Sequence, residues 1–361
     1  MKKIMFVLLA CLITLTLLSG CSNGDKSNSE TLKGCEVLNV YNWGEYIGED
    51  VIDNFEKEYG IKVNYSMFDS NEAMYTKLLG GTVYDILVPS DYMIQRLIEE
   101  DRLTKIDPSK IPNLESLSEN VINLRDEYDN GGQYSVPYFW GSVGIVYDKT
   151  QIDPSKIEAM GWNILKDTTY KSDIFMYDSE RDSFMVALKA LGYSMNTENE
   201  EEINEAYNWL VELHQTMNPA YVTDEVNDEM INGSKKLAVV YSGAAAYIMS
   251  QNENMTFHMP KQGTNVWSDG LVIPKNSKCS DLAHDFINFS LSYDSALDSS
   301  ITVGYTSSNE DVLNELSKEG NEYYGNEAYN LNIDNSKNEV FRHNEVLIKK
   351  LSELWVKVKI S

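Results

Sequence analysis

From residue 36 onward, short apolar runs alternate with amphipathic stretches along the chain. Apolar residues that recur every three or four positions are typical of one helical face, whereas strict alternation is typical of a half-buried strand. Up to residue 100, these patterns predict strands at 38–41, 61–67 and 85–88 and helices at 49–59, 71–79 and 91–100. Gly60 directly follows the first of these helices and is predicted to end it.

The rest of the chain continues this alternation. Apolar runs predict strands at 143–147, 237–241 and 270–273, and helical patterns lie at 182–191, 201–215, 280–290 and 338–357. Strands that alternate with helices indicate βαβ units and a mainly parallel sheet, so the predicted fold class is α/β. A chain of 361 residues is long enough for two domains. Ligands of such sheets bind beyond the carboxyl ends of strands, which here are residues 42–47 and 90–92.

The first twenty residues have the layout of a secretory signal peptide. Lys2 and Lys3 are followed by an apolar run at 4–18 and then by Ser19, Gly20 and Cys21. This ending resembles a bacterial lipobox, in which Cys21 is lipidated and becomes the mature N-terminus. Residues 22–34 are polar, so the segment 21–35 is predicted to be a lipidated cysteine with a flexible tether. A plain signal peptide or a membrane helix is the alternative.

Two cysteines remain after export and lipidation, because Cys11 leaves with the signal peptide. Cys35 and Cys279 can form a disulfide outside the cytoplasm or remain as free thiols. The choice depends on the geometry of the fold, and the sequence leaves both alternatives open.

Composition narrows the classes of function. With 30 basic and 56 acidic residues, the chain repels nucleic acid and attracts cations, although acidity also serves solubility. No Walker loop, G-x-S-x-G or C-x-x-C motif is present, and the four histidines have no metal-ligand spacing: His214, His258, His284 and His343. We therefore expect no metal, no cofactor and no catalytic residue. A pair of hydrolytic carboxylates would leave no local motif, so an enzyme is less favoured rather than excluded.

Residues 41–47 place two aromatic side chains and a carboxylate directly after a predicted strand. This segment, YNWGEYI, resembles the opening of the spermidine/putrescine-binding proteins of bacterial ABC transporters. The resemblance continues in order through 84–92, 134–141, 179–182, 239–243, 267–271 and 303–305, and so covers nearly all of the mature chain. It implies the type II periplasmic-binding-protein fold, with the ligand in a cleft between two lobes.

The lobes implied by the resemblance are discontinuous in sequence. Lobe 1 is 36–146 plus 270–309, and lobe 2 is 147–269 plus 310–361. Cys35 and Cys279 then border the same lobe, which favours their pairing.

The resemblance also implies the ligand-binding residues. They are Trp43, Glu45, Tyr46, Tyr92, Asp182, Tyr241, Trp267, Asp269 and Tyr305. These residue types suit a polyamine, because a buried ammonium needs an acceptor and favours an aromatic face, and its methylenes need apolar walls. We expect Asp269 and Asp182 to be the chief partners of ammonium groups, with Glu45 supporting them from the other lobe. Trp267 and Asp269 are two apart on an extended segment and therefore point the same way.

Each of these residues also has a structural interpretation. Aromatic residues at strand ends often belong to the core, and Asp182 or Asp91 could simply cap a helix. Asp91, Ser179 and Phe341 are additional possible ligand residues. Some relatives carry a carboxylate at the position of Ser179, a tryptophan at that of Tyr241 and a glutamine at that of Phe341. The choice between spermidine and putrescine as the ligand therefore stays open.

The resemblance implies a monomeric, extracytoplasmic lipoprotein, anchored to the membrane through Cys21, that binds a polyamine and delivers it to an ABC permease. The lobes are expected to close around the ligand, and no covalent bond is expected to form or break. The alternatives are a binding protein for another cation, a sugar or ferric iron, a secreted carboxylate-dependent hydrolase, and a sensor lipoprotein that binds no small molecule.

Overall fold

The computed structural model describes residues 35–223 and 225–361. Within them, no helix is both long and apolar enough to cross a membrane. The predicted signal peptide, the lipidation site Cys21 and most of the predicted tether lie outside the described residues. The described residues form one compact unit.

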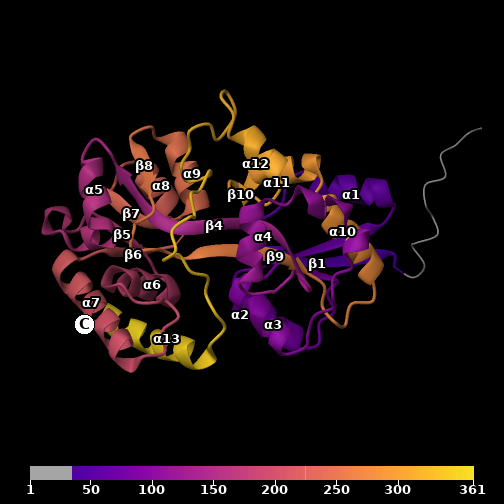
Figure 1. Cartoon of the computed structure of the whole chain (residues 1–361), viewed down its shortest axis with the longest axis horizontal. Coiled ribbons are helices and arrows are strands. Elements are labelled where there is room, and N and C mark those ends of the chain that lie inside the picture. Colours follow the sequence, from indigo (N-terminus) through magenta and orange to yellow (C-terminus); the bar gives the residue numbers. More distant parts are fainter. Residues whose placement is uncertain (1–34, 224) are drawn as a thin grey trace, which may run out of the picture. The chain divides into compact units, whose positions relative to one another are not determined.

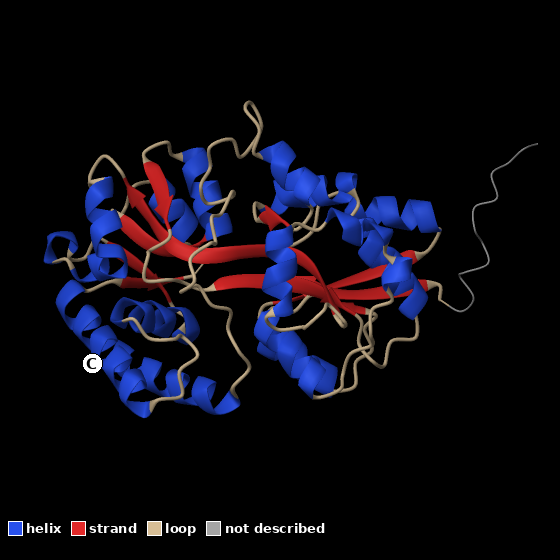
Figure 2. Ribbon diagram, viewed as in Figure 1, coloured by secondary structure: helices blue, strands red, loops and turns tan. Residues whose placement is uncertain are grey.

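The strands form one continuous sheet in the order β2-β1-β3-β9-β4-β7-β5-β6, with β8 and β10 also paired to β4 (Figure 1). Its strands are β1 (Val37–Trp43), β2 (Lys62–Phe68), β3 (Ile86–Leu87), β4 (Ser135–Asp148), β5 (Ile174–Tyr177), β6 (Ala220–Val222), β7 (Leu237–Tyr241), β8 (Met255–His258), β9 (Val266–Val272) and β10 (Thr306–Ser307). Helices lie on both sides of the strands in Figure 2, so the α/β class predicted from the sequence is confirmed.

The expectation of a mainly parallel sheet is wrong, because the sheet is mixed. β1 pairs in parallel with β2 and β3, and β5 pairs in parallel with β6 and β7. In the middle, β9 runs antiparallel to both β3 and β4, and β4 runs antiparallel to β7, β8 and β10. The alternation of strands and helices in sequence reveals only the βαβ units. It cannot show that β9, from far along the chain, inserts between β3 and β4.

The long strand β4 joins the two parallel parts of the sheet. Its first half, from Ser135 to Ser142, pairs with β9, and its second half, from Val143 to Tyr147, pairs with β7. All 14 residues of β4 are buried. Burial on both faces explains why this stretch is a nearly continuous apolar run rather than an alternating one.

Local sequence signals account for most helix boundaries. The helices are α1 (Val51–Tyr59), α2 (Asn71–Leu79), α3 (Asp91–Glu99), α4 (Glu119–Asp126), α5 (Pro154–Met160), α6 (Glu180–Leu191), α7 (Glu200–Met217), α8 (Val226–Ile231), α9 (Ser242–Gln251), α10 (Ser280–Ser290), α11 (Tyr293–Val303), α12 (Glu310–Leu316) and α13 (Glu345–Lys359). Gly60 ends α1 at a φ of 68°, in the left-handed region that glycine adopts readily, as predicted. The side chain of Ser70 accepts the Ala73 amide and so starts α2.

The last helix begins seven residues later than predicted. Residues 338–344 are not helical, and within them the backbone of Glu339 pairs with Thr264 and Val266 beside β9. The side chain of Asn344 then accepts the Leu347 amide and caps α13. A helical pattern read from sequence cannot detect that a neighbouring strand competes for these backbone groups.

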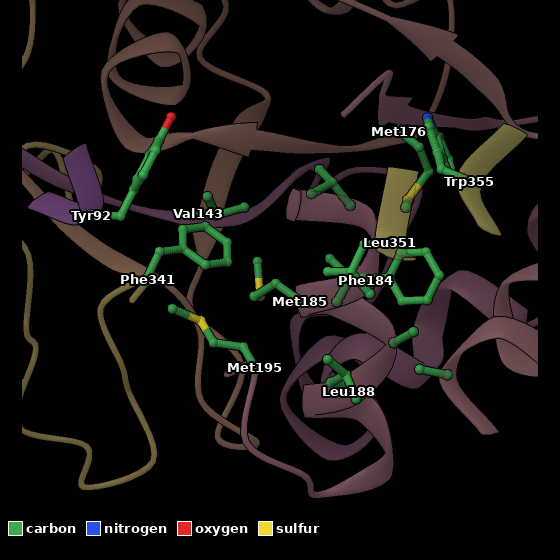
Figure 3. Close-up of a cluster of buried hydrophobic side chains, with 14 of the residues drawn as sticks. Tyr92, Val143, Met176, Phe184, Met185, Leu188, Met195, Phe341, Leu351 and Trp355 are labelled. Atoms are coloured by element: carbon green, nitrogen blue, oxygen red, sulfur yellow. The ribbon is translucent and has the colours of Figure 1, made fainter. Parts of the chain in front are cut away.

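The core at one end of the sheet lies between α6 and α13. In Figure 3, Phe184 and Leu188 of α6 lie near Leu351 of α13, within one cluster of buried side chains. This packing fixes the first turn of α6, which carries Asp182. The apolar faces predicted for these helices are therefore the faces that position part of the candidate site.

Cys35 and Cys279 form a disulfide, with their Cα atoms 5.8 Å apart. The bond joins the chain just before β1 to the residue that precedes α10. It therefore closes a loop that contains most of the folded chain.

Replacement of Cys279 by serine is expected to lower the free energy of unfolding by about 2–4 kcal/mol, because the bond restricts the unfolded chain. Urea denaturation of the variant and of the wild type measures the difference. Reduced wild type should show the same loss as the variant, and equal stability of oxidised wild type and variant would contradict the expectation.

Candidate functional site

Two tyrosine–carboxylate pairs form the centre of the candidate site. The hydroxyl of Tyr46, in the loop after β1, donates to Asp269 Oδ2 on β9 over 2.7 Å. The hydroxyl of Tyr241, at the end of β7, donates to Asp182 Oδ2 in the first turn of α6, also over 2.7 Å. Both carboxyl groups are buried. Residues far apart in sequence therefore produce the same motif twice.

Aromatic side chains connect the two pairs into one site. The ring of Tyr305 lies 5.9 Å from that of Tyr46 and 5.0 Å from that of Trp267, measured between centroids. Trp267 in turn lies 6.3 Å from Tyr241, edge to face. The two carboxylates are thus joined by a wall of flat, largely apolar surfaces. Trp267 and Asp269 share one face of β9, as alternation along a strand requires.

Two glycines make room for this wall. Gly141 is the β4 partner of Trp267, and a Cβ atom there would lie 2.5 Å from the indole ring. A Cβ atom at Gly243 in α9 would lie 2.3 Å from the ring of Tyr305. Any larger residue at either position would displace an aromatic ring. Neither glycine was singled out from the sequence, although both lie in segments of the resemblance, Gly141 in 134–141 and Gly243 in 239–243.

The carboxyl groups are not fully satisfied. Asp182 Oδ1, Asp269 Oδ1 and Trp267 Nε1 are buried and have no hydrogen-bond partner in the described part of the chain. Burial raises the pKa of Asp269 to about 6, although hydrogen bonds from Ser90 and Tyr46 oppose the shift. Burial also raises the pKa of Asp182, opposed chiefly by the Tyr241 hydroxyl. A buried carboxylate with a free oxygen favours a cationic hydrogen-bond donor.

One cation lies beside the site, and the sequence reasoning did not assign it a role. The guanidinium of Arg181 stacks on the ring of Tyr92 at 3.7 Å, and its Nη2 donates to Glu72 over 3.3 Å. The Tyr92 hydroxyl also donates to Glu72 and accepts from Asn71. Arg181 therefore covers one face of Tyr92. The only signal in the sequence was its place next to Asp182 within the segment 179–182.

The other predicted residues lie less centrally. Trp43 packs against Phe68 with ring centroids 4.6 Å apart, and its Nε1 is buried without a partner in the described chain. Glu45 is exposed at a φ of 49° and forms no ion pair or hydrogen bond with the described residues. Neither residue has a described contact with the two tyrosine–carboxylate pairs. The structure thus brings six of the nine predicted residues into one connected group: Tyr46, Asp182, Tyr241, Trp267, Asp269 and Tyr305.

The three additional candidates have different surroundings. Ser179 caps α6 by accepting the Asp182 amide, so the cap expected near Asp182 is Ser179 itself. Phe341 belongs to the buried cluster of Figure 3, and the Arg181 guanidinium lies 5.9 Å from its ring. Asp91 begins α3 and is buried.

A cavity of about 570 Å³ adjoins the site. Asp182, Tyr241 and Tyr305 line it together with Glu322 and Asn227, which no sequence motif indicated. Its wall is therefore acidic and aromatic. Among the described residues, no group of three or more His, Cys, Asp or Glu side chains could hold a metal ion.

The family model for bacterial extracellular solute-binding proteins matches residues 50–327. The chain belongs to this family. This solute-binding protein is 36% identical to the spermidine/putrescine-binding periplasmic protein of Salmonella typhimurium over 276 residues, which are 76% of this chain and 78% of that relative.

Two solved structures have folds similar to that of this chain. PotD, the spermidine/putrescine ABC transporter substrate-binding protein of Streptococcus pneumoniae, has a TM-score of 0.78 and 35% identity and covers 90% of this chain and 99% of its own. The Tp0655 (TpPotD) lipoprotein of Treponema pallidum has a TM-score of 0.76 and 28% identity. The match covers 90% of this chain and 100% of that one. The solute-binding protein therefore has the two-lobed α/β fold of periplasmic binding proteins, as the resemblance implied.

Proposed function

We propose that this protein binds a polyamine, spermidine or putrescine or both, outside the cytoplasm and delivers it to an ABC permease. The observation that carries the proposal is the pair of buried carboxylates, Asp182 and Asp269, each with one oxygen that lacks a hydrogen-bond partner in the described chain. A polyamine supplies ammonium groups for these oxygens and methylenes for the aromatic wall between them. A sugar supplies no charge to balance two buried carboxylates.

The names of the relatives support this reading, because the Salmonella protein and the Streptococcus structure are both named for spermidine and putrescine. A carboxylate-dependent hydrolase is not favoured, since the family consists of binding proteins. We propose no catalytic residue and no cofactor, and we propose that the protein acts as a monomer.

The ligand is proposed to hold two lobes together. With the lobes at 36–146 plus 270–309 and 147–269 plus 310–361, the hydrogen bond from Tyr46 to Asp269 crosses the boundary. So does the contact of Tyr305 with Trp267. Because α12 packs against α11 and β10, we propose that the chain passes from lobe 1 to lobe 2 for the last time after Leu316 rather than after Asn309.

Ion pairs across the same boundary favour closure. Arg96 pairs with Glu345, and Arg342 pairs with Glu127 over 2.6 Å. Arg181 reaches Glu72 from the opposite lobe. The carboxylate partner of each pair is solvent-exposed, which weakens the pair, so closure depends on the ligand's greater affinity for the closed state.

The location is proposed to be the outer face of the cell membrane, with residues 1–20 as a signal peptide and Cys21 as the lipidated residue. The disulfide between Cys35 and Cys279 is typical of an oxidising compartment. The Treponema relative is itself named a lipoprotein. Metabolic labelling with a radioactive fatty acid tests the anchor, and Cys21→Ser should abolish the label.

Isothermal titration calorimetry on the chain that begins at residue 22 tests the binding function. The ligands are spermidine, putrescine and a neutral sugar, each added to protein freed of ligand by unfolding and refolding. One polyamine per chain should bind, and the sugar should not. If folded protein binds neither polyamine, the proposed function is wrong.

Gly243→Ala is expected to weaken polyamine binding, because the added methyl displaces the ring of Tyr305. Overpacking of this kind costs about 1–3 kcal/mol. Gly44→Ala is the matched control, since a methyl there meets nothing within 4 Å. Calorimetric titration of both variants should show weaker binding for Gly243→Ala alone, and equal affinities would contradict the role given to Tyr305.

A further inference from the structure

The cavity of about 570 Å³ lies at one end of the candidate site. Asp182, Tyr241 and Tyr305 line it, whereas Trp267 and Asp269 do not. The cavity is therefore on the Asp182 side of the aromatic wall. Its volume is within the range of about 300–1,000 Å³ that is usual for pockets that bind small molecules. A diamine with one ammonium at Asp269 and the other at Asp182 would not fill this cavity.

The lining of the cavity is negatively charged. Asp182 is only 3% exposed, and its buried Oδ1 has no hydrogen-bond partner in the described chain. Glu322 is exposed and forms no ion pair or hydrogen bond with the described residues. The third acidic residue of the lining, Asp178, is already paired with Lys359. No described lysine, arginine or histidine lines the cavity, so the charges of Asp182 and Glu322 have no counterion there.

Uncharged oxygens add further acceptors. Asn227 lines the cavity, and its Oδ1 is buried without a partner in the described chain. Helix α11 ends at the cavity with residues 301–304, and the last carbonyls of a helix carry the negative end of its dipole. The start of α9 at Gly243 contributes a positive end of similar size, about half an elementary charge. The two dipoles offset each other, so the two carboxylates decide that the cavity favours a cation.

Aromatic side chains continue from the wall into the cavity. Tyr241 and Tyr305 belong to both, and Tyr247 of α9 and Tyr323 also line the cavity. Tyr247 is 48% exposed, so its ring offers a free apolar surface. Such rings pack against methylenes and attract ammonium groups. The cavity thus repeats the combination of acceptor and aromatic surface that is found in the rest of the site.

We propose that this cavity is a subsite for a third ammonium group, so that the protein prefers spermidine to putrescine. Two ammonium groups of spermidine bind Asp269 and Asp182, and the third binds Glu322 and the Oδ1 of Asn227. The methylenes that lead to the third ammonium pack against Tyr247 and Tyr305. Putrescine has no third charge for this subsite. The inference rests on the proposed function and adds to it the choice of ligand and the residues that make it.

The test is calorimetric titration with spermidine and with putrescine at pH 7.5, using the chain from residue 22 freed of ligand. Wild type should bind spermidine about tenfold more tightly than putrescine. Glu322→Gln removes the charge from the subsite and keeps the shape of the side chain. It should lower the ratio of spermidine affinity to putrescine affinity about fivefold, which is a large effect for an ion pair that stays in contact with solvent.

Glu319→Gln is the matched control. Glu319 is exposed and lies three positions before Glu322, but it does not line the cavity. This variant has the same net charge as Glu322→Gln and should keep the wild-type ratio of affinities. Circular dichroism establishes that the variants are folded. If Glu322→Gln does not fold, Asn227→Asp decides the proposal, because it adds a charge to the subsite and should raise the same ratio.

The outcomes separate the two proposals. If wild type binds putrescine as tightly as spermidine, or if folded Glu322→Gln keeps the wild-type ratio, the third subsite is wrong and the binding function stands. The subsite is also wrong if Glu319→Gln lowers the ratio as much as Glu322→Gln does. If wild type binds neither spermidine nor putrescine, both proposals fail.

Discussion

Asp269→Asn is expected to weaken polyamine binding about 100-fold. Removal of one partner of a buried charge pair costs 2–5 kcal/mol, and about 3 kcal/mol corresponds to two orders of magnitude in Kd. The asparagine keeps the shape of the side chain and still accepts a hydrogen bond from Tyr46, so the loss reports on charge. Because the wild-type carboxylate has an unpartnered buried oxygen in the described chain, its removal should not destabilise the ligand-free fold.

Calorimetric titration of spermidine and putrescine measures the effect. The matched control is Asp281→Asn, which removes the same charge from an exposed residue of α10 that pairs with Lys110. This control should change the affinity less than twofold. A loss of similar size in both variants would mean that the overall negative charge, and not the carboxylate in the site, attracts the ligand.

Acidification is expected to weaken binding at least about 30-fold between pH 7.5 and pH 4.5. The ammonium of the ligand favours the carboxylate form of Asp269, whose pKa is about 6 in the ligand-free fold because of burial. Below that pKa, binding must first remove the proton, and the apparent affinity falls about tenfold for each pH unit. Asp182, whose pKa burial also raises, adds to the loss.

The same shift affects stability in the opposite sense. The folded, ligand-free protein holds the Asp269 proton up to about pH 6, whereas the unfolded chain loses it near the ordinary aspartate pKa of 3.8. The folded state therefore binds more protons in this window, and the contribution of Asp269 to stability falls as the pH rises through it. A bound polyamine reverses this trend, because it compensates the charge.

Melting curves with and without spermidine, recorded from pH 4.5 to 7.5, measure both effects. The increase in Tm caused by the ligand should be small at pH 4.5 and large at pH 7.5. Asp269→Asn should have a smaller and flatter ligand effect. An increase in wild-type Tm that does not depend on pH would show that no carboxyl group of the site titrates on binding.

Some of this protein could be predicted from the sequence because the controlling forces are local. Apolar periodicity located α2, α3, α6, α7 and α10 and the strands around them. Gly60 marked the end of α1 through its freedom to adopt a positive φ. Alternation along β9 placed Trp267 and Asp269 on one face. The ordered segments shared with polyamine-binding proteins supplied the residue types of the site.

The tertiary structure decided which of these residues meet. Tyr46 contacts Asp269 only because β9 inserts into the sheet beside β3. Tyr241 contacts Asp182 only because α6 follows β5, which pairs in parallel with β7. The same packing left Glu45 exposed and placed Arg181 on Tyr92. The start of α13 moved to Glu345 because a neighbouring strand took the backbone of Glu339. Periodicity and capping depend on residues a few positions apart, whereas burial and pairing depend on segments brought together from far along the chain. Burial is also the reason that the carboxylates of the site favour a cationic partner.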